Sequence, residues 1–98
     1  MKKLFVKQKN GRKIGVLIAM KDVEGKVVVG FSQCCKNDSF DKSFGEEIAA
    51  RRAFAYSDRD CVDNIPFKVA AALPGFLDNC KRYFKDCEMP RWTNGFTC

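Results

Sequence analysis

The pair Asn10-Gly11 lies between two segments in which β-branched and aromatic residues alternate with polar ones. Such a pair is a strong β-hairpin signal, because both residue types tolerate the positive φ angles of tight hairpin turns. A three-residue loop that starts at Asn10 pairs Val6 with Val16 and sorts apolar from polar side chains, whereas a two-residue loop mixes them. We therefore predict the three-residue loop, with Gly11 at the positive-φ position.

A second turn signal follows at residues 22–25, where two acidic residues and a glycine interrupt the apolar pattern. A four-residue loop there pairs Ile18 with Val29 and assigns both residues to the face that the first hairpin buries. Two independent turns thus predict one three-stranded antiparallel meander. Its predicted buried face consists of Leu4, Val6, Ile14, Val16, Ile18, Met20, Val27, Val29 and Phe31.

Two helices are predicted after the meander. Ser43 and Glu46 have the spacing of a capping box, which predicts a helix over residues 44–57 with Ser43 as the N-cap. Apolar residues then recur at helical spacing from residue 65 to about residue 86. Asp63 or Asn64 is the expected cap of this second helix, and a proline in its first turn is tolerated.

The fold class follows from this order of elements. Ninety-eight residues, 46% of them apolar, suffice for one domain with a core of its own. We predict an α+β fold in a single domain, residues 1–98, with the order β-β-β-α-α and both helices packed on one face of the sheet. Pro74 is expected to kink the second helix or divide it. Trp92 and Phe96 are expected to pack into the domain.

The positive charge is concentrated at the start of the chain. The first thirteen residues hold six basic side chains and no acidic one, whereas the other twelve basic residues balance the twelve acidic ones. The net charge of +6 therefore belongs to the first predicted hairpin. The predicted register places its lysines and Phe5 on the face opposite the core. The candidate partner-binding residues are Lys3, Phe5, Lys7, Lys9, Arg12 and Lys13, with Arg51 and Arg52 as an extension.

Three interpretations of this basic face remain open. Lysines interleaved with an aromatic ring are typical of sheets that bind nucleic acid, where ammonium groups neutralise phosphates and rings stack on bases. A positive face also attracts an acidic protein partner. Finally, lysines on an edge strand prevent it from pairing with other chains.

The sequence contains no pattern typical of an enzyme or a metal site. It has no histidine, the usual general base near neutral pH, and no CxxC pair that would favour zinc. Lys7 and Lys9 interrupt what would otherwise start as a signal peptide, so we expect a cytoplasmic protein with reduced thiols. We expect no enzymatic activity, no cofactor and no metal. An enzymatic alternative would depend on Cys34 or Cys35. The six cysteines are Cys34, Cys35, Cys61, Cys80, Cys87 and Cys98.

A segment within residues 26–53 carries a recurring pattern. A G-[WF]-S-x-C strand end leads through an F-[DN]-K turn into a G-x-x-I-A-x-x-R-A helix. The residues that carry it are Gly30, Phe31, Ser32, Cys34, Phe40, Asp41, Lys42, Gly45, Ile48, Ala49, Arg52 and Ala53. This pattern resembles one found in small uncharacterised accessory proteins of bacteriophages.

The resemblance implies a role in binding. Such a phage protein would bind and inhibit or modulate a bacterial host complex, in the manner of an anti-defence or anti-CRISPR protein, inside the host cytoplasm. Its expected partner is a bacterial protein or nucleoprotein complex. We expect no binding to a membrane. The alternative is a small DNA- or RNA-binding protein that uses the same basic hairpin. Both a monomer and a homodimer remain open.

Overall fold

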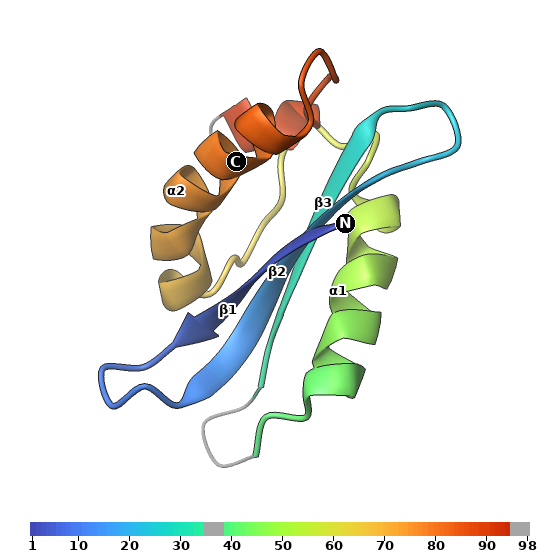
Figure 1. Ribbon diagram of the computed structural model, residues 1–98. Helices are drawn as coiled ribbons and strands as arrows, with labels where there is room; N and C mark the ends of the chain where they lie inside the picture. Colours follow the sequence, from blue (N-terminus) through green and yellow to red (C-terminus); the bar gives the residue numbers. More distant parts are fainter. Residues whose placement is uncertain (35–38, 95–98) are drawn as a thin grey trace.

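The computed structural model describes residues 1–34 and 39–94 (Figure 1). Three antiparallel strands form one sheet in the order β1-β2-β3, and two helices follow. The predicted α+β fold and the order β-β-β-α-α are therefore confirmed. In chain order, the elements are β1 (Lys2–Lys7), β2 (Lys13–Lys21), β3 (Val27–Gln33), α1 (Lys42–Ala55), α2 (Phe67–Tyr83) and the 3₁₀ helix η1 (Arg91–Asn94).

The two helices cover opposite faces of the sheet, so the prediction that both pack on one face is wrong. Val16 and Ile18 of β2 form a cluster with Ala49 of α1. Leu17 and Ala19, which alternate with them along β2, belong to the cluster that contains the buried residues of α2. Figure 1 shows the sheet standing between the two helices. The molecule is therefore layered as helix, sheet and helix.

Both hairpins differ by one position from the predicted register. Val6 lies opposite Gly15 rather than Val16, and Ile18 lies opposite Gly30 rather than Val29. The prediction assumed one apolar face, but both faces of the sheet are buried, and Leu17, which is absent from the predicted buried face, is fully buried. With two apolar faces, the sorting of apolar from polar residues does not determine the register.

Helix α1 lies very close to the sheet. A Cβ atom added at Gly30 would lie 2.0 Å from the Ala49 carbonyl oxygen and 2.4 Å from the Ala53 backbone nitrogen. The Ser32 hydroxyl donates a 2.8 Å hydrogen bond to the Gly45 carbonyl oxygen. Small residues on both elements therefore permit the backbones of α1 and β3 to make direct contact.

The start of α1 differs from the capping-box prediction. Asp41 is the N-cap, and its carboxylate accepts a 3.0 Å hydrogen bond from the Phe44 amide. Ser43 already lies in the first turn of the helix. Asp and Ser are both good N-caps, so the capping-box spacing alone does not locate the start of the helix.

Helix α2 begins without a side-chain cap, because its N-cap position is Pro66 and no side chain bonds there. The expected caps Asp63 and Asn64 precede it, and Asn64 has a φ of 59°. The helix continues through Pro74, so the alternative of two shorter helices is wrong, while a kink at this proline stays a prediction. None of the described helices is both long and apolar enough to cross a membrane.

Large side chains fill the layer between α2 and the sheet. Trp92 is fully buried there, and its ring meets that of Tyr56 edge to face at 5.9 Å. Its burial confirms the expectation for this residue, whereas Phe96 lies outside the described residues. The chain after α2 includes the 3₁₀ helix η1, and Val27 at the start of β3 donates a 3.1 Å hydrogen bond to the Glu88 carbonyl oxygen.

A candidate partner-binding surface

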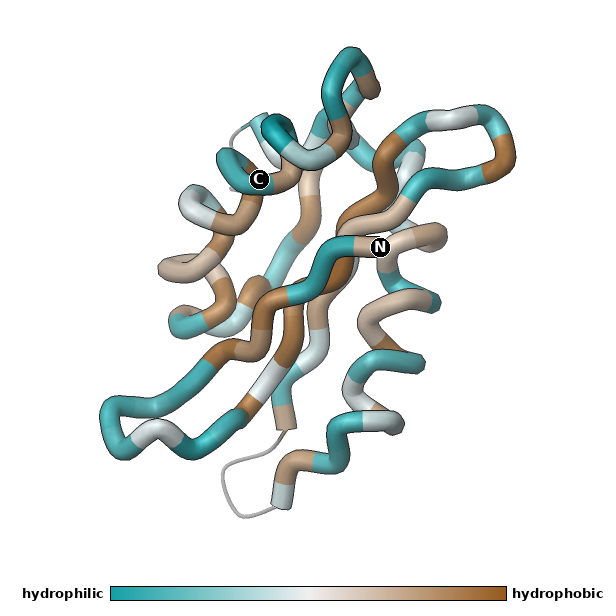
Figure 2. Tube along the Cα trace, viewed as in Figure 1, coloured by the Kyte–Doolittle hydropathy of each residue, from teal (hydrophilic) through white to brown (hydrophobic). Residues whose placement is uncertain are grey.

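The tip of the first hairpin carries exposed positive charge. The Gln8 amide donates to the Arg12 carbonyl oxygen at 2.9 Å, and Gly11 has a φ of 84°, as predicted. The register shifts at the end of β1, so that Lys7 lies opposite Lys13. Like charges placed opposite each other on neighbouring strands repel, and an anion bound between them would relieve that repulsion. Figure 2 shows the hydrophilic tip projecting beyond the apolar strands.

A cation from α1 joins this hairpin. The Lys13 ammonium lies 4.6 Å from the centre of the Phe5 ring, and the Lys42 ammonium lies 5.4 Å from it. Both distances are within cation–π range. Two segments that are distant in sequence therefore bring their lysines together. We call this group the basic end, and it consists of Lys7, Lys9, Arg12, Lys13 and Lys42.

Phe5 is an anchor rather than an open platform. Its ring meets Phe40 edge to face at 6.2 Å and packs against the cluster of Val16, Ile18 and Ala49. The side chain is half-buried, beside the ammonium of Lys13 described above. The predicted role of Phe5 as an outward ring on a face opposite the core is therefore wrong, because α1 covers that face.

Lys3 connects β1 to α1. Its ammonium donates a 2.9 Å hydrogen bond to a carboxylate oxygen of Glu46, and the two side chains are 41% and 26% exposed. A partly exposed ion pair of this kind contributes about 0.5 kcal/mol. Lys3 faces the same side of the sheet as Phe5, but its charge is already paired.

Arg51 and Arg52 do not join the basic end. Arg51 forms an exposed ion pair of 2.6 Å with Glu47, one helical turn earlier. The Arg52 guanidinium donates a 3.1 Å hydrogen bond to the Phe31 carbonyl oxygen, at the far edge of the sheet. Arg51 and Arg52, predicted to extend the partner-binding surface, therefore lie apart from the basic end. Arg51 is on the surface of α1, and Arg52 is hydrogen-bonded to β3. The sequence did not indicate Lys42 as a partner-binding residue, because its proximity to Phe5 depends on α1 lying across the sheet.

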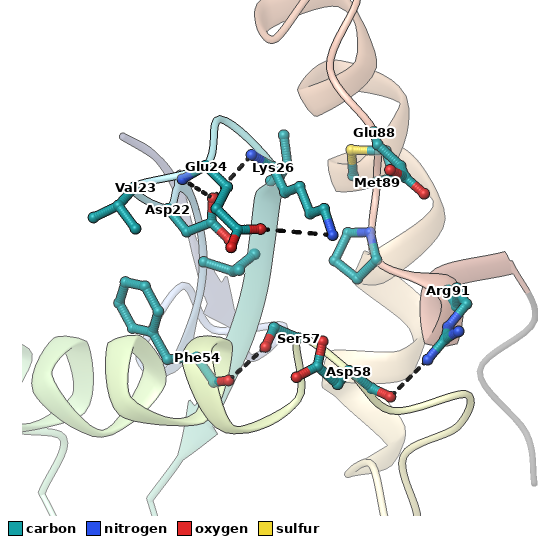
Figure 3. Close-up of a pocket in the computed structure, with 13 residues that line it drawn as sticks. Asp22, Val23, Glu24, Lys26, Phe54, Ser57, Asp58, Glu88, Met89 and Arg91 are labelled. Carbon is teal, nitrogen blue, oxygen red and sulfur yellow. Dashed lines mark hydrogen bonds and ion pairs between the residues drawn. The ribbon is translucent and has the colours of Figure 1, made fainter.

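A cleft of about 410 Å³ lies at the other end of the molecule, between the β2–β3 turn, the end of α1 and the segment before η1 (Figure 3). Asp22 accepts hydrogen bonds from the Glu24 and Lys26 amides, and the Arg91 guanidinium donates a 2.8 Å hydrogen bond to the Asp58 carbonyl oxygen. Among the described residues, no three histidine, cysteine or acidic side chains are grouped to hold a metal ion. No pattern in the sequence indicated this cleft.

A second cleft of about 430 Å³ lies where β3 ends and α1 begins. Phe40, Phe44 and Ile48 make it largely apolar, and Phe44 is 59% exposed. Cys34 also lines this cleft and packs against the main core. The cleft adjoins the α1 side of the basic end, because Phe40 contacts Phe5.

The cysteines do not all match the prediction of reduced thiols. Cys61 is disulfide-bonded, so the prediction is wrong for this residue. Cys80 and Cys87 are thiols, and burial raises the pKa of Cys80 to about 11. A thiol with a raised pKa is a poor nucleophile at neutral pH. Cys35, one of the two residues on which an enzymatic alternative would depend, lies outside the described residues.

No family model, no curated protein and no solved structure matches this chain. The resemblance to bacteriophage accessory proteins therefore stays a prediction from the sequence pattern.

Proposed function

We propose that this protein is a non-enzymatic binding protein that holds an acidic surface of a bacterial protein or nucleoprotein complex and inhibits or modulates that complex. The observation that carries the proposal is the convergence of Lys13 and Lys42 on the Phe5 ring, at the end of the molecule where Lys7 lies opposite Lys13. Cations from β2 and from the start of α1 are thereby brought together at one end of the molecule.

Electrostatics favour an anionic partner at this surface. Lys7, Lys9, Arg12 and Lys13 are exposed, and the net charge of +6 arises from the first thirteen residues. Such a field accelerates association with an acidic partner and weakens as salt is added. Binding is therefore expected to be fast and salt-sensitive.

The biological setting follows from the resemblance in residues 26–53. It favours a bacteriophage accessory protein that acts on host defence, in an anti-CRISPR-like manner, in the cytoplasm of the bacterial host. A protein of this kind needs a surface for its partner rather than a catalytic centre.

Charge reversal at the hairpin tests the proposal. The test variant combines Lys7→Glu, Lys9→Glu and Lys13→Glu, and the control variant combines Lys68→Glu, Lys81→Glu and Lys85→Glu. All six lysines are exposed, and both variants change the net charge equally. We expect the immobilised control to capture the same bacterial complex as the unmodified protein, and the hairpin variant to lose it. Equal capture by both variants would contradict the proposal.

Nucleic acid is the second candidate, because the same five cations suit phosphate groups. The environment of Phe5 is less favourable to it, since Phe40 and two ammonium groups already occupy the surroundings of the ring. A mobility-shift experiment at low ionic strength with generic DNA and RNA separates the candidates. A shift that the hairpin variant abolishes would favour nucleic acid, and no shift would exclude it.

A further inference from the structure

The two edge strands of the sheet differ in the hydrogen bonding of their outward backbone groups. On β3, the Val27 amide donates to the Glu88 carbonyl oxygen, and the Phe31 carbonyl oxygen accepts from Arg52. On β1, the described part of the chain provides no backbone hydrogen bond beyond the pairing with β2. The edge of β3 is therefore closed at two points, and the edge of β1 is open.

The hydrogen-bond phase of β2 determines which groups face the open edge. Cys34 donates its amide to the Ile14 carbonyl oxygen at 2.9 Å, and Asp22 donates to the Lys26 carbonyl oxygen at 2.8 Å. Residues of an antiparallel strand bond alternately to one neighbouring strand and to the other. The even-numbered residues of β2 therefore bond to β3, and the odd-numbered residues, such as Leu17, bond to β1.

The same alternation fixes the outward groups of β1. Leu17 lies opposite Leu4, so Leu4 bonds to β2. Its neighbours Lys3 and Phe5 consequently direct their backbone N–H and C=O groups toward solvent at the open edge. A strand added there would find a donor and an acceptor at each of these two residues.

The two faces beside this edge have different chemistry. Lys3, Phe5 and Lys7 face the α1 side, where Lys13 and Lys42 add further charge. Leu4 faces the other side and is 41% exposed. Tyr83 of α2, which is 56% exposed, lies on that side with the Lys2 ammonium 5.4 Å from its ring centre.

We propose that an extended segment of the partner, in which acidic and apolar residues alternate, adds to β1 as a fourth strand. The acidic side chains would face Lys7 and the basic end, and the apolar side chains would face Leu4 and Tyr83. This inference rests on the proposed function and names how the acidic partner is held. It uses the main-chain recognition that other strand-adding complexes use, with side chains providing the specificity.

A second copy of this chain is a poor occupant of the same edge. An antiparallel pair of β1 strands centred on Phe5, in which the outward backbone groups of both copies meet, would place Lys3 opposite Lys7 twice. Like charges directly opposite each other are unfavourable. The same lysines that discourage self-pairing attract an acidic strand, so edge protection and partner recognition select the same residues.

Amide exchange measured by NMR tests this inference. The probe is a synthetic peptide of alternating glutamate and valine with blocked ends, and the control peptide has the same sequence with its backbone nitrogens methylated. The control has the same side chains and charge but no amide donors, so it cannot complete a strand ladder. We expect the glutamate–valine peptide to slow exchange at the Lys3 and Phe5 amides by at least about tenfold. The methylated peptide should leave both amides unprotected.

A pair of variants at Lys3 provides a second test. Lys3→Ala and Lys3→Pro both remove the ammonium that pairs with Glu46, but only proline also removes the outward N–H. We expect the alanine variant to bind the glutamate–valine peptide about threefold more weakly than the unmodified protein. The proline variant should not bind it. Thermal unfolding of both variants shows whether the proline variant is folded. The amide-exchange measurement uses the unmodified protein and does not depend on the proline variant.

The outcomes separate this inference from the proposed function. Peptide binding without protection of Lys3 and Phe5, equal binding of the two peptides, or no peptide binding would each overturn strand addition. Sedimentation that showed a dimer formed through β1 would also overturn it. The proposed function fails only if the charge-reversed hairpin still captures its partner, which is a separate experiment.

Discussion

The two faces of the sheet are packed by opposite means. On the α1 face, Gly30 allows the backbones to touch, because a Cβ atom added there would meet main-chain atoms of α1, whereas one added at Gly45 would meet the Phe40 ring. On the α2 face, large side chains such as Leu73 and Trp92 fill a wider gap. The first face should therefore be most sensitive to added atoms and the second to removed atoms.

This difference has a functional consequence. Because α1 lies directly on the sheet, its first residue, Lys42, reaches the Phe5 ring on β1. The residue before the helix, Asp41, caps its first turn and holds that end in place. The close packing of α1 thus positions one of the five cations of the basic end, whereas α2 contributes stability and the exposed ring of Tyr83 beside the open edge.

Removal of a large side chain from the α2 face should have the largest effect. Leu73 is fully buried, so Leu73→Ala is expected to lower the free energy of unfolding by about 4 kcal/mol. Urea unfolding followed by circular dichroism measures this loss. Phe67→Ala is the control, because Phe67 lies on the same helix and is 86% exposed. A loss at Phe67 as large as that at Leu73 would contradict the assigned orientation of α2.

Addition of one methyl group on the α1 face should have the next largest effect on the free energy of unfolding. Gly30→Ala is expected to lower the free energy of unfolding by about 3 kcal/mol, because the new Cβ meets the backbone of α1. Gly75→Ala is the matched control in α2, where a Cβ has open space. That substitution should stabilise the protein by about 0.7 kcal/mol through helix propensity. Similar effects at the two glycines would remove the difference between the faces.

Stability at high pH should report on the buried thiol of the α2 face. Burial raises the pKa of Cys80 to about 11 from an ordinary 9.0, so the folded state keeps a proton that the unfolded state releases. The stabilisation is complete below pH 9 and is lost as the pH rises through 11, by up to about 3 kcal/mol. Unfolding measured between these pH values should show a steeper loss for the unmodified protein than for Cys80→Ala. Parallel curves would show that this thiol is not buried in solution.

Removal of the Arg52 hydrogen bond at the β3 edge should have the smallest effect on stability. Arg52→Ala removes the hydrogen bond to the Phe31 carbonyl oxygen and is expected to cost about 1 kcal/mol, measured by thermal unfolding. Arg51→Ala, which breaks only an exposed pair with Glu47, should change stability by less than about 0.5 kcal/mol. Partner capture should survive both substitutions. Loss of capture in either variant would restore these arginines to the binding surface.

Local signals in the sequence predicted the elements of the fold well. The Asn10-Gly11 turn and the turn at residues 22–25 are each specified by neighbouring residues, and Gly11 has the expected positive φ. Register and face depended on tertiary packing instead. Because Leu17 is as deeply buried as Ile18, the apolar pattern did not reveal which helix covers which side.

The candidate site was predictable only in part. The cations of the hairpin were visible as a cluster within thirteen residues. The Lys42 contact with Phe5 and the separation of Arg52 from the hairpin depend on how α1 crosses the sheet. Spacing along the chain carries no information about that crossing. The closed and open edges likewise follow from distant contacts, such as the bond between Val27 and Glu88.

Two roles of the hairpin lysines, partner binding and edge protection, can be separated by neutralising them. The variant Lys7→Gln, Lys9→Gln and Lys13→Gln does so when partner capture and sedimentation are measured on the same preparation. We expect the neutral variant to sediment like the unmodified protein and to capture at least about tenfold less partner. A neutral variant that self-associates and still captures the partner fully would show that these lysines only protect the edge.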